Sequence, residues 1–181
     1  MEATLLINFD DILHCTGGLR GNIDVEKINP HIYNAQILYL EPLLGSSLYE
    51  KIISLVNTGD ITGTTYAVYK TLLDEYITPS IAFHAVELYI PLNAFQVADG
   101  GTYQFQATNS ITSPLDDIDR IAIKYKIIGS KYDSKLSNYL CKHENDYIEY
   151  INNTGLVGKT EATPRIGWYL GNSRMGSKIR M

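Results

Sequence analysis

Residues 113–140, SPLDDIDRIAIKYKIIGSKYDSKLSNYL, decide the fold class because they carry the longest helical pattern in the chain. Ser113 and Pro114 suit the start of a helix, and the aspartates that follow favour the positive end of its dipole. This segment predicts an amphipathic helix whose apolar seam is close to a heptad repeat. The seam consists of residues three or four positions apart: Ile118, Ile121, Tyr125, Ile128, Tyr132, Leu136 and Tyr139.

A related stripe of Leu140, Tyr147 and Ile151 extends the predicted helix to about residue 151. A helix of ~38 residues would be ~57 Å long, which exceeds the ~30 Å span of a small domain. The sequence therefore predicts either a bend at Gly129 or a helix that projects and packs on a neighbouring subunit. The candidate subunit–subunit residues are the tyrosines of this segment: Tyr125, Tyr132, Tyr139 and Tyr147.

Shorter helical patterns precede the long one. Asn29 and Pro30 suit the N-cap and the first position of a helix. Later in the chain, Pro79 restarts a helix and Pro91 ends it. The predicted ranges are 31–40, 47–56, 66–77 and 80–90.

A different pattern surrounds the turn Asp99-Gly100-Gly101. Phe95 and Val97 alternate with polar residues before the turn, and Tyr103 and Phe105 alternate after it. This predicts a small β-hairpin at about residues 94–108. The expected fold class is mainly α: a bundle of about four to five helices with a long C-terminal helix, the hairpin insertion and an extended C-terminal arm.

The arm is expected to comprise residues 152–181 and the helical domain residues 1–151. Frequent glycines and the absence of a helical period argue against a helix in the arm. Its apolar side chains are costly to leave in water, so we expect them to be buried against a partner. The candidate partner-binding residues are these apolar side chains and the basic ones around them: Arg165, Ile166, Trp168, Tyr169, Leu170, Arg174, Lys178 and Arg180.

Charge is unevenly distributed along the chain. From Gly155 onward there are five basic residues and one acid, whereas the preceding part has 10 basic and 19 acidic residues. Such an acidic body does not suit a protein that grips nucleic acid with its main surface. The 14 tyrosines suit either protein–protein interfaces or the edge of a core.

Targeting and redox features are few. No run approaches the ~18 apolar residues of a membrane span, and the N-terminus lacks the pattern of a signal peptide. Two cysteines, Cys15 and Cys141, are too few for a disulfide framework, and we expect them to be free thiols in a reducing compartment.

The motifs that carry chemistry are incomplete. GLVGKT at 155–160 resembles the end of a phosphate-binding loop, but Asn153 replaces the required first glycine. His143-Glu144 begins like a zinc motif whose second histidine is replaced by Tyr147. We therefore expect no enzyme activity, no metal and no cofactor. An enzyme that uses scattered residues is the alternative to this expectation.

One segment resembles a known family. NIDVEKINPHIYNAQILYLEPLLGSSLYEKI, residues 22–52, is similar to the opening of the head–tail connector, or adaptor, proteins of tailed bacteriophages, especially those of crAss-like phages. The later order of helices, hairpin and long helix also matches, so the resemblance covers roughly residues 5–151. The matching positions are Ile23-Asp24, Lys27-Ile28, Pro30, Ile32, Ala35-Gln36, Pro42, Leu44-Gly45 and Leu48-Tyr49.

The resemblance implies a structural protein of the virion neck that is present in the host cytoplasm before assembly. Such adaptors form a closed ring below the portal protein, most often of twelve copies, and contact further neck or tail rings. Genomic DNA passes through their lumen without sequence-specific binding. Two alternatives stay open: a small phage regulator that binds nucleic acid through its basic C-terminal tail, and a neck ring that does not touch the portal.

Overall fold

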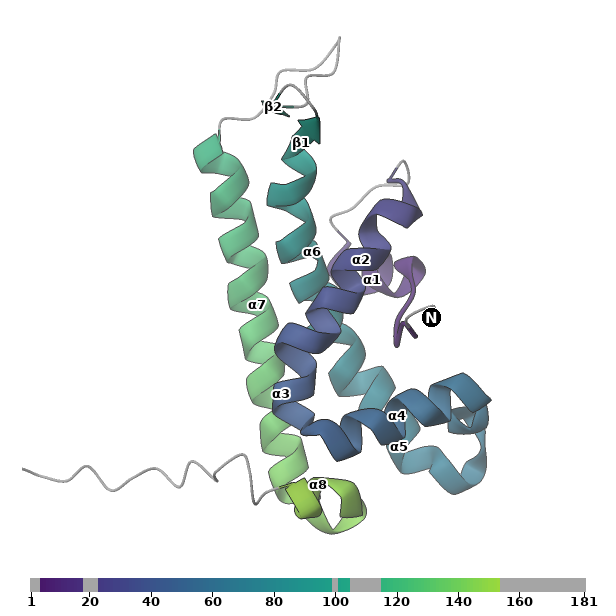
Figure 1. Ribbon diagram of the computed structural model, residues 1–181. Helices are drawn as coiled ribbons and strands as arrows, with labels where there is room; N and C mark the ends of the chain where they lie inside the picture. The colour runs from purple at the N-terminus through teal and green to yellow at the C-terminus, as the bar shows by residue number, and fades with distance from the viewer. Residues whose placement is uncertain (1–3, 18–22, 99–100, 105–114, 154–181) are drawn as a thin grey trace, which may run out of the picture.

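The computed structural model describes residues 4–17, 23–98, 101–104 and 115–153 (Figure 1). This part of the chain is mainly helical, which confirms the expected class. The candidate residues of the arm lie outside the described residues. The α-helices are α1 (Phe9–Thr16), α2 (Val25–Ala35), α3 (Glu41–Leu44), α4 (Ser46–Thr58), α5 (Ala67–Leu72), α6 (Thr78–Ala94), α7 (Leu115–Lys142) and α8 (Ile148–Asn153).

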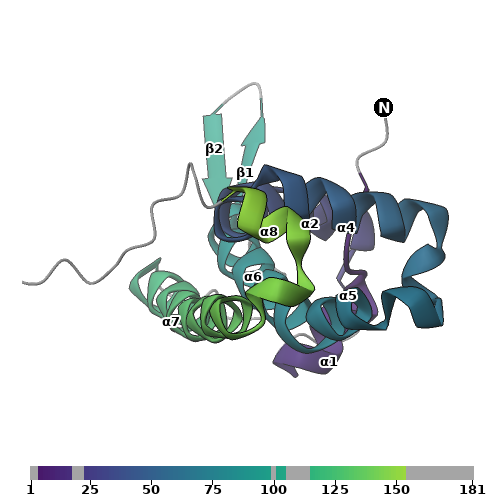
Figure 2. The same cartoon turned by 90° about the horizontal axis from the view of Figure 1, so that it is seen from below.

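Helix α6 is the centre of the molecule. Every residue from Ser80 to Glu87 is buried, so this helix needs neighbours on all sides. The long helix α7 lies beside it, and α1 and α2 pack on other sides (Figures 1 and 2). The position of α7 is therefore set mainly by α6.

Prolines do not divide the helices where the sequence predicts. A π-turn over Gln36–Leu40 joins α2 to α3, and another over Leu73–Ile77 joins α5 to α6. Each π-turn ends two residues before a proline, Pro42 or Pro79. The proline ring crowds the carbonyl four residues earlier, and that carbonyl lies in the widened turn in both cases.

Two further helix boundaries differ from the prediction. Helix α2 begins at Val25, where the Asp24 side chain accepts a hydrogen bond from the Glu26 backbone N–H. Pro30 therefore lies inside a helix and does not start one. Likewise, α6 continues past Pro91 to Ala94. At Pro30, burial of the neighbouring Ile28 and Ile32 offsets the local cost of the proline.

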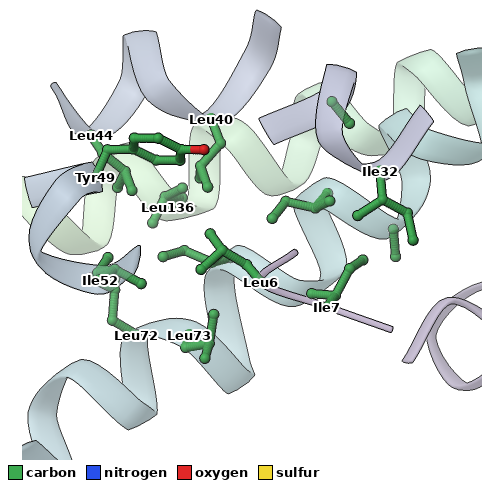
Figure 3. Close-up of a cluster of buried hydrophobic side chains, with 14 of the residues drawn as sticks. Leu6, Ile7, Ile32, Leu40, Leu44, Tyr49, Ile52, Leu72, Leu73 and Leu136 are labelled. Atoms are coloured by element: carbon green, nitrogen blue, oxygen red, sulfur yellow. The ribbon is translucent and has the colours of Figure 1, made fainter. Parts of the chain in front are cut away.

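The N-terminal segment is held in the core by a buried glutamine. The Gln36 side chain accepts a hydrogen bond from the Leu6 backbone N–H at 2.7 Å and donates one to the Thr4 carbonyl at 3.1 Å. Leu6 and Ile7 thereby lie among side chains of several helices, including Leu72 and Leu136 (Figure 3). The buried amide satisfies backbone groups that would otherwise be costly in the core.

At the position where the sequence predicts a hairpin, two short strands pair antiparallel. Strand β1 (Phe95–Ala98) follows α6 directly, and β2 (Gly101–Gln104) lies beside it. Phe95 is opposite Gln104, and Ala98 is opposite Gly101. The two strands extend from the end of the packed helices α6 and α7 (Figure 1).

The prediction that the long helix runs to about residue 151 is wrong. Helix α7 ends at Lys142, a 3-10 turn follows at Glu144–Asp146, and α8 returns to pack against α4 (Figure 2). Tyr147 is fully buried at this reversal, and its side chain lies in the main core. Burying this large ring stabilises the turn back onto the body, so neither a bend at Gly129 nor a projection beyond residue 142 is needed.

Candidate functional site

The side of α7 that faces α6 is lined by small residues at one place. Ala122 and Gly129 are buried and lie seven residues apart, on the same side as the buried Leu136. A Cβ atom added at Gly129 would lie 2.7 Å from Cε1 of His84. Glycine is therefore required there because the imidazole of α6 occupies the space of a side chain.

His84 lies between two carboxylates. Its Nδ1 is 2.9 Å from Glu87 Oε2 on the same helix, and its Nε2 is 2.9 Å from Asp133 Oδ2 on α7. Ser80 Oγ donates to the other oxygen of Asp133 at 2.6 Å. The phenol ring of Tyr39 stacks on the imidazole with the ring centroids 3.8 Å apart. Together these contacts form a polar network across the α6–α7 contact.

The network favours the charged form of His84. Burial alone would lower the pKa of His84, but hydrogen bonds and the charges of Asp133 and Glu87 outweigh it, so the pKa is raised. Both ring nitrogens then donate to carboxylates. Tyr39 also donates to Glu87 at 3.2 Å, and Lys126 Nζ lies 3.7 Å from the same carboxylate. The buried charges are thus paired, which is the condition for tolerating them in a core.

This network holds α7 in place, and its geometry does not favour a reaction centre. His84 is 1% exposed, and the Ser80 hydroxyl is bonded to Asp133, not to the histidine. A nucleophile would need a hydrogen bond to its base and access for substrate. Within the described ranges, no group of three or more His, Cys, Asp and Glu residues could hold a metal ion.

The four candidate subunit–subunit tyrosines make ring contacts or hydrogen bonds with other residues of the same chain. Tyr125 and Tyr132 pack on Phe83 of α6, with ring centroids 5.9 and 5.4 Å away. Tyr139 stacks on Tyr76 at 4.0 Å. The assignment of Tyr147 to a subunit interface is wrong, because this ring is fully buried and its hydroxyl donates to the Val68 carbonyl at 3.2 Å. The other three are half-buried and fasten α7 to the body.

The opposite side of α7 is exposed and carries large apolar residues. Ile123 and Ile127 lie one helical turn apart and are 55% and 52% exposed. Of the predicted seam, Leu136 is buried, but Ile121 and Ile128 are exposed, so the seam lies at the edge of the α6–α7 contact and further isoleucines point away from the core. We define the outer face of α7 by its exposed apolar and basic side chains: Arg120, Ile123, Lys124, Ile127, Ile128 and Lys131.

Basic residues are concentrated on this helix. Helix α7 carries six of the chain's 15 Lys and Arg residues and four acids. Three of these acids, Asp116, Asp117 and Asp119, lie at its N-terminal end, before the stretch from Arg120 to Lys142. The first 98 residues have four basic and eleven acidic residues. Helix α4, which carries Glu50 and Lys51, and the N-terminal segment belong to this part of the chain and lie on the side of the molecule away from α7 (Figures 1 and 2). The molecule is thus electrostatically two-sided.

An open pocket lies on the acidic side. It is formed where the N-terminal segment meets α2 and α4, and we call it the α2–α4 pocket. Tyr33, which is 40% exposed, lines this pocket, and Glu26 is the charged residue of the lining. The lining residues are Thr4, Leu5, Glu26, Asn29, Pro30, Tyr33 and Asn57.

Sequence reasoning missed both the polar network and the outer face of α7. His84 and Glu87 are three residues apart on one helix, so their pairing was visible, but Asp133 comes from another helix. The outer face was missed because Ala122 and Gly129 did not count as apolar positions, although both are buried and Gly129 lies against His84 of α6. Among the described residues, no helix is long and apolar enough to cross a membrane.

Comparison with known proteins places the chain in one family. A model described as "Family of unknown function (DUF6712)" matches residues 40–159, which include α6, α7 and the whole outer face of α7. No curated protein and no solved structure matches the chain. Because the family model covers well over half of the 181 residues, the protein belongs to the DUF6712 family, whose function is unknown.

Proposed function

We propose that this protein is a head–tail connector of a tailed bacteriophage, a structural virion protein that forms a ring below the portal and continues the DNA channel. The resemblance of residues 22–52 to connectors of crAss-like phages suggests this role. The observation that carries the proposal is the outer face of α7, which no described residue covers although the described part of the chain has a well-packed core. A repeating assembly would cover this face once per copy.

Self-assembly into a ring also suits the two-sided charge. A closed ring forms through two different faces of each subunit. The basic outer face of α7 and the acidic side that carries the α2–α4 pocket are different faces of opposite charge. By the family resemblance, twelve copies would close the ring. In the rest of the body, acidic residues outnumber basic ones. This negative charge would let genomic DNA pass without sequence-specific binding.

The C-terminal arm is the proposed contact with the portal or an adjacent ring. Trp168, Tyr169 and Leu170 supply apolar anchors, and Arg165 supplies a donor for acidic groups on the partner. Trp and Arg are common anchors of binding energy in protein interfaces. Ile166, Arg174, Lys178 and Arg180 complete the proposed contact.

A double substitution in the arm tests this contact. Trp168→Ala with Leu170→Ala should weaken binding to the portal by at least about tenfold, because two apolar anchors are lost. We expect the urea-unfolding curve of the body to stay unchanged, since the core described above is formed by residues between Leu6 and Tyr147. Binding is measured by surface plasmon resonance on immobilised portal rings. Unchanged affinity would contradict the anchor.

The experiment for the proposed function itself combines light scattering with electron microscopy. The purified chain is measured alone and mixed with portal protein of the same phage. A ring, or a stable complex with the portal, is the expected result. A chain that stays monomeric and does not bind the portal would contradict the connector role.

A second function is favoured by one observation. The basic residues of α7, together with those of the arm, could bind nucleic acid, as expected for a regulator. The isoleucines between these residues and the acidity of the remaining body argue against it. A gel shift with duplex and single-stranded DNA at physiological salt separates the two functions. Retardation that is lost when Arg165 and Arg174 become Glu would favour the regulator.

A further inference from the structure

We infer that the outer face of α7 in one copy docks head to tail into the α2–α4 pocket of the next copy. This inference rests on the proposed self-assembly and names the two surfaces that meet. It replaces the tyrosines of α7 as the main subunit contact, because those rings are largely committed to α6 and to the core.

Both surfaces present apolar groups, one on a helix and the other in a pocket. The outer face of α7 offers the exposed isoleucines Ile123 and Ile127. The pocket is lined by Leu5, Pro30 and the half-exposed ring of Tyr33, so it presents apolar surface in a concave setting. Its volume of about 610 Å³ leaves room for several side chains of a neighbouring helix. Burying apolar groups from both copies would drive the association.

The charges at the two surfaces are opposite. Lys124 and Lys131 are exposed on the outer face, and neither has an ion pair within the described part of the chain. Glu26 lines the pocket, and Glu50 lies seven residues before Asn57 on the same side of α4. These glutamates likewise have no ion pair among the described residues. Such complementarity favours a second copy over a partner of unrelated charge.

The positions of the two surfaces favour head-to-tail pairing over a symmetric dimer. In a symmetric dimer, α7 would meet α7 and the lysines of both copies would face each other, which is unfavourable. In head-to-tail pairing, the outer face of one copy meets the pocket of the next. The two ends of the assembly then keep one free outer face and one free pocket. Because α7 and α4 lie on opposite sides of the molecule, further copies can add until the chain of subunits closes (Figure 1).

Two variants with complementary defects test the pairing. The face variant carries Ile123→Glu and Ile127→Glu and keeps its pocket. The pocket variant carries Glu26→Lys and Tyr33→Lys and keeps its outer face. All four positions are exposed, so circular dichroism and urea unfolding should show both variants folded. Val68→Glu, at an exposed apolar residue of α5, is the matched control and should associate like the unaltered chain.

Sedimentation velocity measures the variants singly and mixed. Each variant alone should have its dissociation constant for self-association raised by at least about tenfold. The equimolar mixture should form a 1:1 dimer and nothing larger, because one intact face and one intact pocket remain to meet. Absence of this dimer, while the unaltered chain associates, would overturn the inference. Association of the pocket variant with itself would also overturn it, since that result indicates an α7–α7 contact.

These outcomes are separate from those that test the connector role. If the unaltered chain forms rings on the portal but the mixed variants do not pair, the inference fails and the connector role stands. If the mixed variants pair but the unaltered chain neither closes a ring nor binds the portal, the connector role fails and the inference stands. A chain that does not self-associate at any concentration overturns the inference whatever it binds.

Discussion

Gly129 sets the distance between the two longest helices by having no side chain. The imidazole of His84 lies where a Cβ atom would be, so the contact between α6 and α7 depends on this one position. A glycine inside a helix costs up to about 1 kcal/mol relative to alanine. That cost is accepted here because it allows the close approach.

Gly129→Ala should therefore destabilise the protein although alanine is the better helix former. Overpacking of this kind costs about 1–3 kcal/mol, which exceeds the gain in helix propensity. Urea unfolding followed by circular dichroism measures the difference. Ser130→Ala, at the exposed neighbouring residue, is the control and should change stability by less than about 0.5 kcal/mol. An unchanged or higher stability of the Gly129 variant would contradict the close contact.

Tyr147 acts at the same scale at the other end of α7. Its hydroxyl lies 3.2 Å from the Val68 carbonyl and 3.3 Å from the Tyr139 hydroxyl, while its ring is fully buried. Tyr147→Phe should cost about 1 kcal/mol in unfolding free energy, because only hydrogen bonds are lost. Tyr147→Ala should cost about 3–5 kcal/mol, because it leaves a cavity. Equal losses for the two variants would indicate that the ring itself contributes little packing.

At the scale of elements, the sequence predicted which segments are helical but not where the helices begin and end. The apolar spacing from Ile118 to Tyr139 predicted a long helix, and the structure has a helix there, but it ends at Lys142 and not at about residue 151. Pro79 and Pro91 misled the prediction, because the helix passes both of them, with a widened turn before Pro79. The buried side of α7 was misplaced because it includes Ala122 and Gly129, which carry no strong hydrophobic pattern. Such errors arise where tertiary packing overrides local preference.

The α6–α7 contact should depend on pH through His84. The pKa of His84 is raised above its ordinary value of 6.5 by Asp133 and Glu87, against the opposing effect of burial. A raised pKa contributes stability that is fully present below the unfolded pKa and is lost as pH rises through the folded pKa. Tyr39 and Lys126 are the other titratable groups that contact this network.

His84→Gln should therefore cost most at the acid end of the range. Removing one member of a buried charged network costs about 3 kcal/mol. The difference in unfolding free energy between the two proteins should be largest near about pH 6 and should shrink towards about pH 9. Asp133→Asn, which removes the charge facing Nε2, is the matched variant and should reduce the pH dependence. A difference that grows with pH would contradict a charged histidine.

At the scale of the whole molecule, the distribution of charge matters more than its total. The net charge of −5 conceals a basic α7 and a strongly acidic remainder of the body. Both features were present in the sequence, but the contrast became visible only when α7 was found on the side away from α4 (Figure 2). Two faces of opposite charge on one chain provide orientation as well as attraction between copies.

Self-association should consequently weaken as salt rises, without disappearing. The Debye length falls from ~10 Å at 0.1 M salt to ~3 Å at 1 M, so attraction between exposed charges is screened. Burial of Ile123 and Ile127 is not screened and should preserve part of the affinity. Sedimentation velocity at the two salt concentrations should show a dissociation constant about tenfold higher at 1 M. A variant with Lys124→Gln and Lys131→Gln should associate more weakly at low salt and lose most of this salt dependence. Tighter association at high salt would instead mean that the surfaces in contact carry like charges, and the head-to-tail arrangement would then be wrong.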